Sequence, residues 1–201
     1  MLDRVPLSPG FQDPVFDSQA TFRSVMSAMA RPGHIEPVAP LLRPPGPLNP
    51  AAAALLLTLA DFETPVWVDE GIRCSETALQ WIRFHTGARV TKEMAESRFA
   101  ILSDSSKPVP LQQFFAGRQD YPDESTTVIL QVAAIETDTG PVLTGPGIET
   151  SLRLNPKPLS ATFWVMAVEN AGLFPRGLDF LFAAKNAVAA LPRSTQIELE
   201  G

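Results

Sequence analysis

A run of ten residues, Thr126 to Ile135 (TTVILQVAAI), constrains the fold more than any other part of the chain. It places β-branched and apolar side chains on both faces, which is typical of a strand in the middle of a sheet. Such a strand needs further layers against both of its faces. The run therefore predicts a sheet that is covered on two sides.

A strongly apolar helix is predicted to cover part of this sheet. Asn49 is a favourable N-cap, Pro50 suits the first helical position, and the residues from Ala51 to Ala60 are strong helix formers. Because the segment is apolar on every side, we expect it to be buried against the sheet.

The other segments mix helices with strands. Helices are predicted from Asp17 or Ser18 to Arg31 with an apolar stripe of Phe22, Val25, Met26 and Met29, from Ser75 to about His85, from Pro108 to Ala116, and from a Ser160 cap to Gly172. Strands are predicted at Pro65–Val68, at Arg98–Leu102, at Val142–Leu143 as an antiparallel partner of the long strand, in a hairpin of Leu178–Ala183 and Ala187–Leu191, and at the edge strand Thr195–Leu199. With no repeat and no break in composition, the sequence predicts one α/β domain over residues 1–201, with a mixed sheet and helices on both faces.

Proline makes up 20 of the 201 residues, against a usual share of about 5%. Residues 1–17 hold three prolines and no periodicity, which predicts an irregular N-terminal arm. Residues 32–50 hold seven, but apolar residues such as Val38 and Leu42 lie between them. We therefore expect this stretch to be extended backbone packed on the body, like an edge strand, rather than a solvated linker.

Charge and composition limit the partners of the chain. With 16 lysine and arginine residues against 22 aspartate and glutamate residues, the net charge is −6 and no basic cluster stands out. Nucleic acids and anionic membranes require basic surfaces, so neither is expected as the main partner. Hydrophobic residues make up 45% of the chain and charged residues 19%, which is enough apolar material for a sizeable core.

The compartment is expected to be the cytoplasm. The start, Met1 to Pro6, has no apolar core of the kind found in secretory signals. The most apolar stretch, Ala51 to Ala60, has ten residues, whereas a membrane span needs about 20. The single cysteine, Cys74, excludes an internal disulfide, a cysteine-rich zinc site and an iron–sulfur cluster held by this chain alone.

The residue types of common catalytic sites do not form recognisable patterns. His34 and His85 lack metal-ligand spacing, and His85 is expected to be a packed or capping residue. No Gly-x-Ser-x-Gly motif exists, and Cys74 has no histidine near it in sequence. The four lysines lie in polar or turn-like segments, unsuited to a Schiff base with pyridoxal phosphate. We therefore expect no metal site and no cofactor.

Two features could bind an anion. Gly145 and Gly147 follow a predicted strand and would let backbone N–H groups approach a phosphate, although Pro146 removes one donor. Arg176 and Arg193 each lie beside a proline turn, and arginine suits phosphate or carboxylate recognition. The simpler interpretations are a tight structural turn for the glycines and a salt bridge for each arginine.

Several segments, in order and spacing, resemble the PhnH family of phosphonate-metabolism proteins, the H subunit of the bacterial carbon–phosphorus lyase core complex. No single motif is specific, but the ordered set is, and it extends from about residue 10 to residue 199. The segments are DPVFDSQA (13–20), FR (22–23), MxxMARPG (26–33), LLLTLADFETPVW (55–67), RFHTG (83–87), VILQV (128–132), LTGPGI (143–148), FPRGLD (174–179) and LPRST (191–195).

This resemblance implies a three-layer α/β/α fold similar to the pyridoxal-phosphate-dependent transferases, without that cofactor. It also implies a homodimer and a larger assembly with subunits G, I and J. That system uses ATP to attach a phosphonate to ribose C1, giving a ribose 1-phosphonate 5-triphosphate, and a radical subunit with an iron–sulfur cluster later breaks the carbon–phosphorus bond. Because Cys74 alone cannot hold such a cluster, this chain is not that radical subunit. The resemblance transfers no catalytic residue.

Three hypotheses follow. The first is a non-catalytic subunit that supports the assembly through protein–protein contacts. The second is a ligand-binding or catalytic subunit for a phosphorylated ribose or nucleotide, with Gly145, Gly147 and Arg193 at the anion. The third is a stand-alone dimer with an unrelated role. The arm at 1–17 and the proline-rich stretch at 32–50 are the segments in which we expect dimer or partner contacts.

Overall fold

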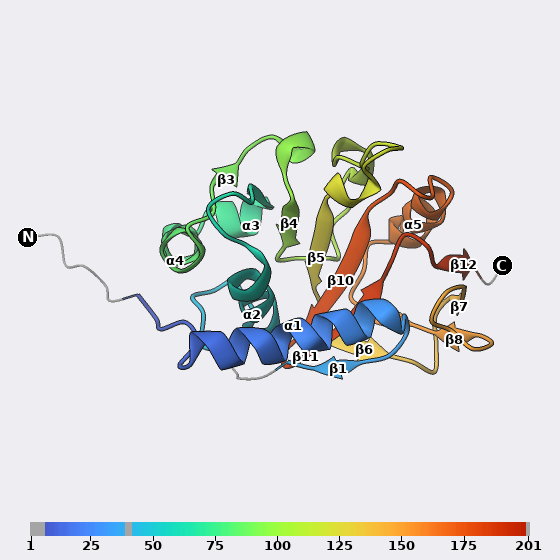
Figure 1. The fold of residues 1–201 in the computed structure, drawn as a ribbon, viewed down its shortest axis with the longest axis horizontal. Helices are drawn as coiled ribbons and strands as arrows, with labels where there is room; N and C mark the ends of the chain where they lie inside the picture. Colours follow the sequence, from blue (N-terminus) through green and yellow to red (C-terminus); the bar gives the residue numbers. More distant parts are fainter. Residues whose placement is uncertain (1–6, 39–41, 200–201) are drawn as a thin grey trace, which may run out of the picture.

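A computed structural model describes residues 7–38 and 42–199. A seven-stranded sheet runs through the middle of the molecule (Figure 1). Five neighbouring strands are parallel; β11 pairs antiparallel with β10, and the edge strand β1 pairs antiparallel with β11. Across the sheet the order is β1 (Glu36–Pro37), β11 (Ala187–Leu191), β10 (Asp179–Ala184), β5 (Thr127–Gln131), β4 (Phe99–Leu102), β2 (Val66–Val68) and β3 (Val90–Thr91).

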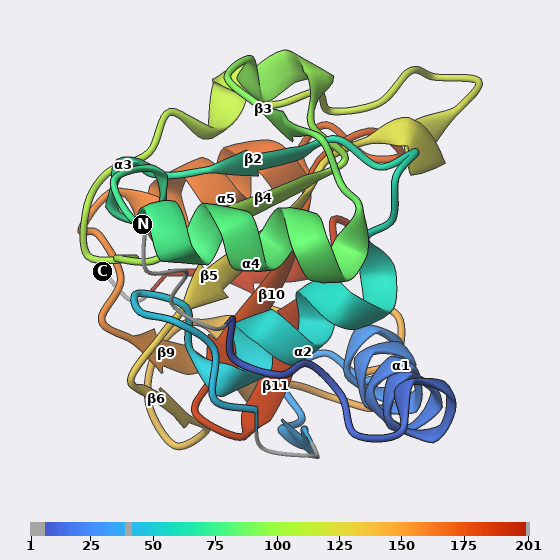
Figure 2. The same ribbon diagram turned by 90° about the vertical axis from the view of Figure 1, so that its left-hand side faces the viewer.

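Helices lie on both faces of this sheet, as predicted (Figure 2). One face carries α1 (Pro14–Ala30), α2 (Pro50–Leu59), the short α3 (Glu70–Arg73) and α4 (Glu76–Thr86). The opposite face carries α5 (Phe163–Ala171). The mixed α/β class expected from the sequence is confirmed.

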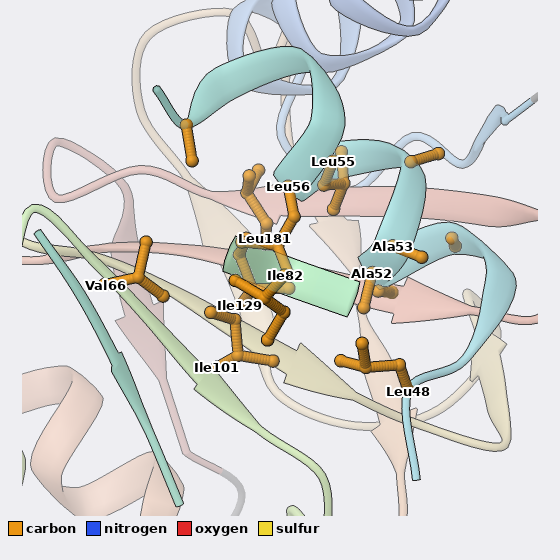
Figure 3. Close-up of a cluster of buried hydrophobic side chains, with 14 of the residues drawn as sticks. Leu48, Ala52, Ala53, Leu55, Leu56, Val66, Ile82, Ile101, Ile129 and Leu181 are labelled. Carbon is orange, nitrogen blue, oxygen red and sulfur yellow. The ribbon is translucent and has the colours of Figure 1, made fainter. Parts of the chain in front are cut away.

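Alternation along the strands divides the core into two clusters. Ile101 and Ile129 point to the face of α2, where Leu55 and Leu56 pack on them (Figure 3). The neighbouring strand residue Val128 belongs to the cluster on the α5 side. This period of two is what a strand buried on both faces requires.

Two small sheets complete the fold. The first is a two-stranded antiparallel ribbon of β6 (Ala134–Glu136) and β9 (Asn155–Lys157). In the second, β7 (Val142–Thr144) lies between β12 (Gln196–Glu198) and β8 (Leu152–Arg153). Single 3₁₀ turns occur at Met94–Glu96, Leu111–Gln113 and Pro122–Glu124.

The capping signals predicted α2 and α4 well. The Asn49 side chain accepts a hydrogen bond from Ala52 N at 2.7 Å, and Pro50 occupies the first turn of α2. Ser75 caps α4, which ends at Gly87 with a φ of +71°. The predicted strands β2 and β4 and the β10–β11 hairpin are also confirmed.

The beginning of α1 was predicted too late, and the predicted irregular arm is correspondingly shorter. Asp13 accepts a hydrogen bond from Phe16 N, and its own N–H donates to Asp17 Oδ2 at 3.0 Å. This reciprocal cap and Pro14 in the first turn start the helix at Pro14. The first six residues of the arm lie outside the described residues.

The predicted apolar stripe of α1 is only partly buried. Val25 is buried and Met29 packs on the core, but Phe22 and Met26 are 47% and 52% exposed. The helix instead turns Thr21 and Ala28 toward the body, together with Val25. In the proline-rich stretch, β1 lies at the edge of the sheet, where an edge strand was predicted, and pairs with β11, while residues 39–41 lie outside the described residues.

Four predictions on the α5 side were wrong in detail. The long strand ends at Gln131, because Ala133 N donates to Lys157 O and the chain joins the ribbon. The strand at 142–144 pairs with β12 and β8 instead of with the long strand. Residues 108–116, which begin with two prolines in three positions, form only a 3₁₀ turn. Ser160 precedes α5, but its side chain does not cap the helix.

Candidate functional site

The turn at Gly145 and Gly147 is built by close backbone packing. Both glycines have positive φ, +125° and +81°. A Cβ on Gly145 would lie 3.1 Å from the carbonyl oxygen of Ser194, and one on Gly147 would lie 2.1 Å from that of Ala30. Ile148 N donates to Gly145 O at 3.1 Å, which closes the turn. The chain therefore needs glycine here for the fold itself, as the simpler interpretation expected.

Arg193 is held by a carboxylate. Its Nε donates to Asp179 Oδ1 at 3.1 Å, its Nη2 donates to Asp179 Oδ2, and its Nη1 donates to Pro122 O. The two side chains of the ion pair are only 14% and 13% exposed. This two-pronged contact is the salt bridge that the simpler interpretation expected, and it leaves the guanidinium with its charge already balanced.

The three predicted anion-binding residues do not all face one another. Gly145 lies beside Ser194, the residue after Arg193, whereas Gly147 faces the end of α1. Arg193 borders an open hollow of about 400 Å³, whose lining is Pro122, Asp123, Phe174, Pro175, Asp179, Pro192, Arg193 and Ser194. Anion binding by Gly145, Gly147 and Arg193 stays a prediction.

A second polar cluster lies where open α/β sheets commonly bind ligands. The chain passes from β2 to β3 on one side and then to β4 on the other, so the carboxyl ends of β2 and β4 mark the switch point. There Asp69 accepts hydrogen bonds from Ser103 N at 2.7 Å, from Ser103 Oγ at 2.8 Å and from Ile72 N at 3.1 Å. A Cβ on Gly71 would lie 2.4 Å from Ser103 Oγ, so Ser103 packs directly against the backbone of α3.

Sequence reasoning did not single out this cluster. Asp69 and Ser103 each follow a correctly predicted strand directly, and that shared position was the available signal. Next to it, the Ser106 hydroxyl donates to Asp104 and lowers the pKa of that carboxyl, with Lys107 adding to the effect. These contacts stabilise the loop after β4 rather than leaving a free reactive group.

The candidate metal and cofactor residues are engaged or exposed. His85 packs on Trp81 with ring centroids 4.8 Å apart, and its Nε2 lies 3.1 Å from Ser8 O, as expected for a packed histidine. Within residues 7–38 and 42–199, no three histidine, cysteine or acidic side chains gather as a metal site. All four lysines are exposed, unlike a Schiff-base lysine in a desolvated pocket. No helix of the described chain is long and apolar enough to cross a membrane.

α1 carries exposed apolar side chains. Val15, Phe22 and Met26 recur at intervals of seven and four residues, so they share one side of the helix. They are 76%, 47% and 52% exposed. We call these three residues the α1 stripe. α1 packs on α2 and β11 (Figures 1 and 2). The buried residues of α1 are Thr21, Val25 and Ala28, so the stripe is not part of that contact.

Comparison with known proteins identifies the family. The family model described as "bacterial phosphonate metabolism protein (PhnH)" matches residues 9–198. The chain is 42% identical over 193 residues to the alpha-D-ribose 1-methylphosphonate 5-triphosphate synthase subunit PhnH of Rhizobium meliloti, covering 96% of both chains. It is 27% identical over 185 residues to the putative C-P lyase subunit protein HtxG of Stutzerimonas stutzeri, covering 91% of this chain and 87% of the relative. The chain belongs to the PhnH family of bacterial phosphonate metabolism proteins.

Proposed function

We propose that the chain is a non-catalytic subunit of the complex that forms a ribose 1-phosphonate 5-triphosphate during phosphonate catabolism. Both relatives are named as subunits, one of a ribose 1-methylphosphonate 5-triphosphate synthase and one, putatively, of a carbon–phosphorus lyase. The partners we propose are subunits G, I and J together with a second copy of this chain, in the cytoplasm. The fold we propose is the three-layer arrangement of pyridoxal-phosphate-dependent transferases without their cofactor, which the covered seven-stranded sheet supports.

The observation that carries this proposal is the α1 stripe. Three large apolar side chains on one side of a 17-residue helix are exposed to water, and two of them, Phe22 and Met26, are neighbours one turn apart. Soluble proteins rarely keep such a surface without a use for it, and burial against a partner removes it from solvent. By contrast, Arg193 is balanced by Asp179, and the carboxylate at the switch point is occupied by Ser103. The geometry therefore favours assembly over catalysis.

The test is co-expression of the tagged chain with subunits G, I and J from the same organism. The wild-type chain is expected to retain all three partners through affinity purification. The double variant Phe22→Asp/Met26→Asp is expected to lose at least one of them, because two carboxylates would be buried at the contact. Ala20→Asp is the matched control, since Ala20 is exposed on the same helix and lies off the stripe.

Two outcomes would contradict the proposal at different levels. If the wild-type chain retains none of the partners, the subunit role fails. If the double variant assembles as well as Ala20→Asp does, the α1 stripe is not the contact. Sedimentation of the isolated chain tests the homodimer separately, because a dimer must show twice the mass of the monomer.

The competing hypothesis, a subunit that binds a phosphorylated ribose or nucleotide, has its own test. Calorimetric titration of the purified chain with ATP and with phosphoribosyl pyrophosphate is expected to show no specific heat. Saturable binding of either ligand, lost in Arg193→Ala while the variant remains folded, would support the alternative and overturn the non-catalytic role.

A further inference from the structure

A cavity lies beside α5, on the face of the sheet opposite the α1 stripe. It has a volume of about 260 Å³ and lies between α5 and the segment around the 3₁₀ turn at Leu111–Gln113. Its wall is mostly apolar, and its two exposed polar members are Gln112 and Glu169. The lining consists of Leu111, Gln112, Phe114, Ala116, Met166, Glu169, Asn170, Leu173 and Leu178. We call it the α5 pocket.

The buried polar group in the wall is already satisfied. Asn170 Nδ2 donates to Leu178 O at 2.9 Å, and Asn170 Oδ1 accepts from Leu178 N at 2.7 Å. These two bonds fix the chain between α5 and β10 and leave the amide no role toward an occupant. The base of the α5 pocket therefore offers apolar contact only.

The surroundings of the pocket are also apolar. Val165 and Val168 on α5 and Leu173 and Phe174 just after it are all exposed, with Phe174 61% accessible. Of these, Leu173 also lines the pocket, so apolar surface is exposed at its edge. A partner that fills the pocket would cover this rim as well, which is the usual arrangement of an anchoring residue surrounded by flatter contacts.

Size separates the possible kinds of occupant. Pockets for small molecules and cofactors typically enclose about 300–1,000 Å³. The α5 pocket, at about 260 Å³, is smaller than that range. It suits one or two inserted side chains better than a nucleotide or a sugar triphosphate.

The charge at the edge of the α5 pocket further limits which groups could bind there. Glu169 places a carboxylate at the rim, and no lining residue is basic. An anionic ligand such as a sugar phosphate would be repelled by this carboxylate. A lysine or arginine of a partner would gain a charge-assisted hydrogen bond to it.

We propose that the α5 pocket receives an apolar side chain of a partner subunit, next to an arginine or lysine of that partner that pairs with Glu169. This inference rests on the proposed function, because the partner belongs to the assembly. It adds a second contact surface, separated from the α1 stripe by the central sheet. The chain then contacts its assembly through both faces.

The test measures the affinity of the purified chain for a purified complex of subunits G, I and J, by interferometry at low and high salt. Glu169→Arg is expected to weaken binding by at least about tenfold, because it places a like charge against the partner's base. Glu169→Gln keeps the size of the side chain and is expected to weaken binding less and to reduce its dependence on salt. Glu149→Arg, the same charge change at another exposed position, is the control and should bind like the wild type.

A pocket-filling variant tests the apolar half of the proposal. Ala116→Phe is expected to occupy the cavity and to reduce affinity as strongly as Glu169→Arg, while its thermal unfolding remains cooperative. Binding of Glu169→Arg and Ala116→Phe within about twofold of the wild type would overturn the inference. If the wild-type chain itself does not bind the complex, the proposed function fails instead, and the two failures are therefore distinguishable.

Discussion

The two faces of the central sheet are packed by different means. On one face, α2 presents four consecutive alanines, Ala51 to Ala54, each at most 1% exposed. Small side chains let this helix approach the sheet and its neighbouring helices closely. On the other face, Phe163 packs edge-on against Phe180 and Phe182, with ring centroids 5.3 and 5.7 Å apart.

This difference explains where the molecule is open. On the alanine-rich face, α2 is buried from Ala51 to Leu56, and the outer side of α1 is exposed. The aromatic face is covered by one helix of nine residues and by irregular segments, and large side chains packed against loops leave the α5 pocket. Close packing by small residues makes a rigid support, whereas sparse cover by large residues leaves a hollow for a partner.

The largest effect is expected from removing the aromatic centre. Phe163→Ala should reduce the free energy of unfolding by about 3–5 kcal/mol. The ring is buried, and few neighbouring side chains on the α5 side could move into the cavity that its removal leaves. Urea denaturation followed by circular dichroism measures the loss. Phe62→Ala, at a phenylalanine that is 75% exposed, should change stability by less than about 0.5 kcal/mol. Equal effects of the two substitutions would show that the aromatic cluster is not a core.

Overpacking the alanine-rich face should cause the next largest loss in the free energy of unfolding. Ala53 is fully buried, and Ala53→Leu adds three carbons where α2 meets its neighbours. The expected loss is about 1–3 kcal/mol by the same denaturation measurement. Ala20→Leu, at an exposed alanine of α1, should be nearly neutral. A neutral Ala53→Leu would mean that this face contains room that the structure does not show.

The alanine-rich face was also the easier one to predict from the sequence. Its helices begin and end with local signals, such as Asn49 before Pro50 and Ser75 before α4, and local signals are visible in one sequence. The error at the start of α1 was one of interpretation, because Asp13 and Pro14 are themselves a helix start. The outward position of Phe22 depends on how α1 packs on α2 and β11, which periodicity alone does not determine.

The α5 side was predicted less well because its structure depends on distant partners. The break after Gln131 exists because residue 133 bonds to Lys157, which lies 24 positions later (157 − 133 = 24). Arg193 was recognised as an arginine of interest, but its partner Asp179 could not be chosen from 22 acids. The α5 pocket has no sequence signal, since residues from two separate segments enclose it.

A smaller loss in the free energy of unfolding is expected when the polar contact between α2 and the sheet is removed. Asn49 both caps α2 and donates from Nδ2 to Ala183 O at 2.8 Å. Asn49→Ala should cost about 0.5–2 kcal/mol, because the cap is lost. Asn49→Ser keeps a capping oxygen but not the bond to β10, so it should recover most of the cap. If the serine variant is as unstable as the alanine variant, the bond to Ala183 matters more than the cap.

The smallest effect is expected in the β6–β9 ribbon, at the edge of the aromatic side. Lys157 Nζ donates to Glu136 Oε2 at 2.7 Å, and Thr139 Oγ1 donates to the same oxygen at 3.0 Å. These bonds, that from Lys157 first, lower the pKa of Glu136 in the folded chain. Lys157→Ala should therefore raise the pKa of Glu136 toward its ordinary value, which an NMR titration of the glutamate side chains measures. Lys185→Ala, at an exposed lysine of the β10–β11 turn, should leave that titration unchanged.

The sign of the stability effect follows from this lowered pKa. A carboxyl with a lowered pKa in the folded state contributes stability above its ordinary pKa and loses it as the pH falls through the folded value. Wild type and Lys157→Ala should thus differ slightly at neutral pH and converge in acid. Both side chains of the pair are about half exposed, so added salt should shrink the difference further. A stability difference between wild type and Lys157→Ala that grows in acid would contradict the role of this pair. By contrast, the stability contributed by the buried alanine contacts of α2 should depend on neither salt nor pH.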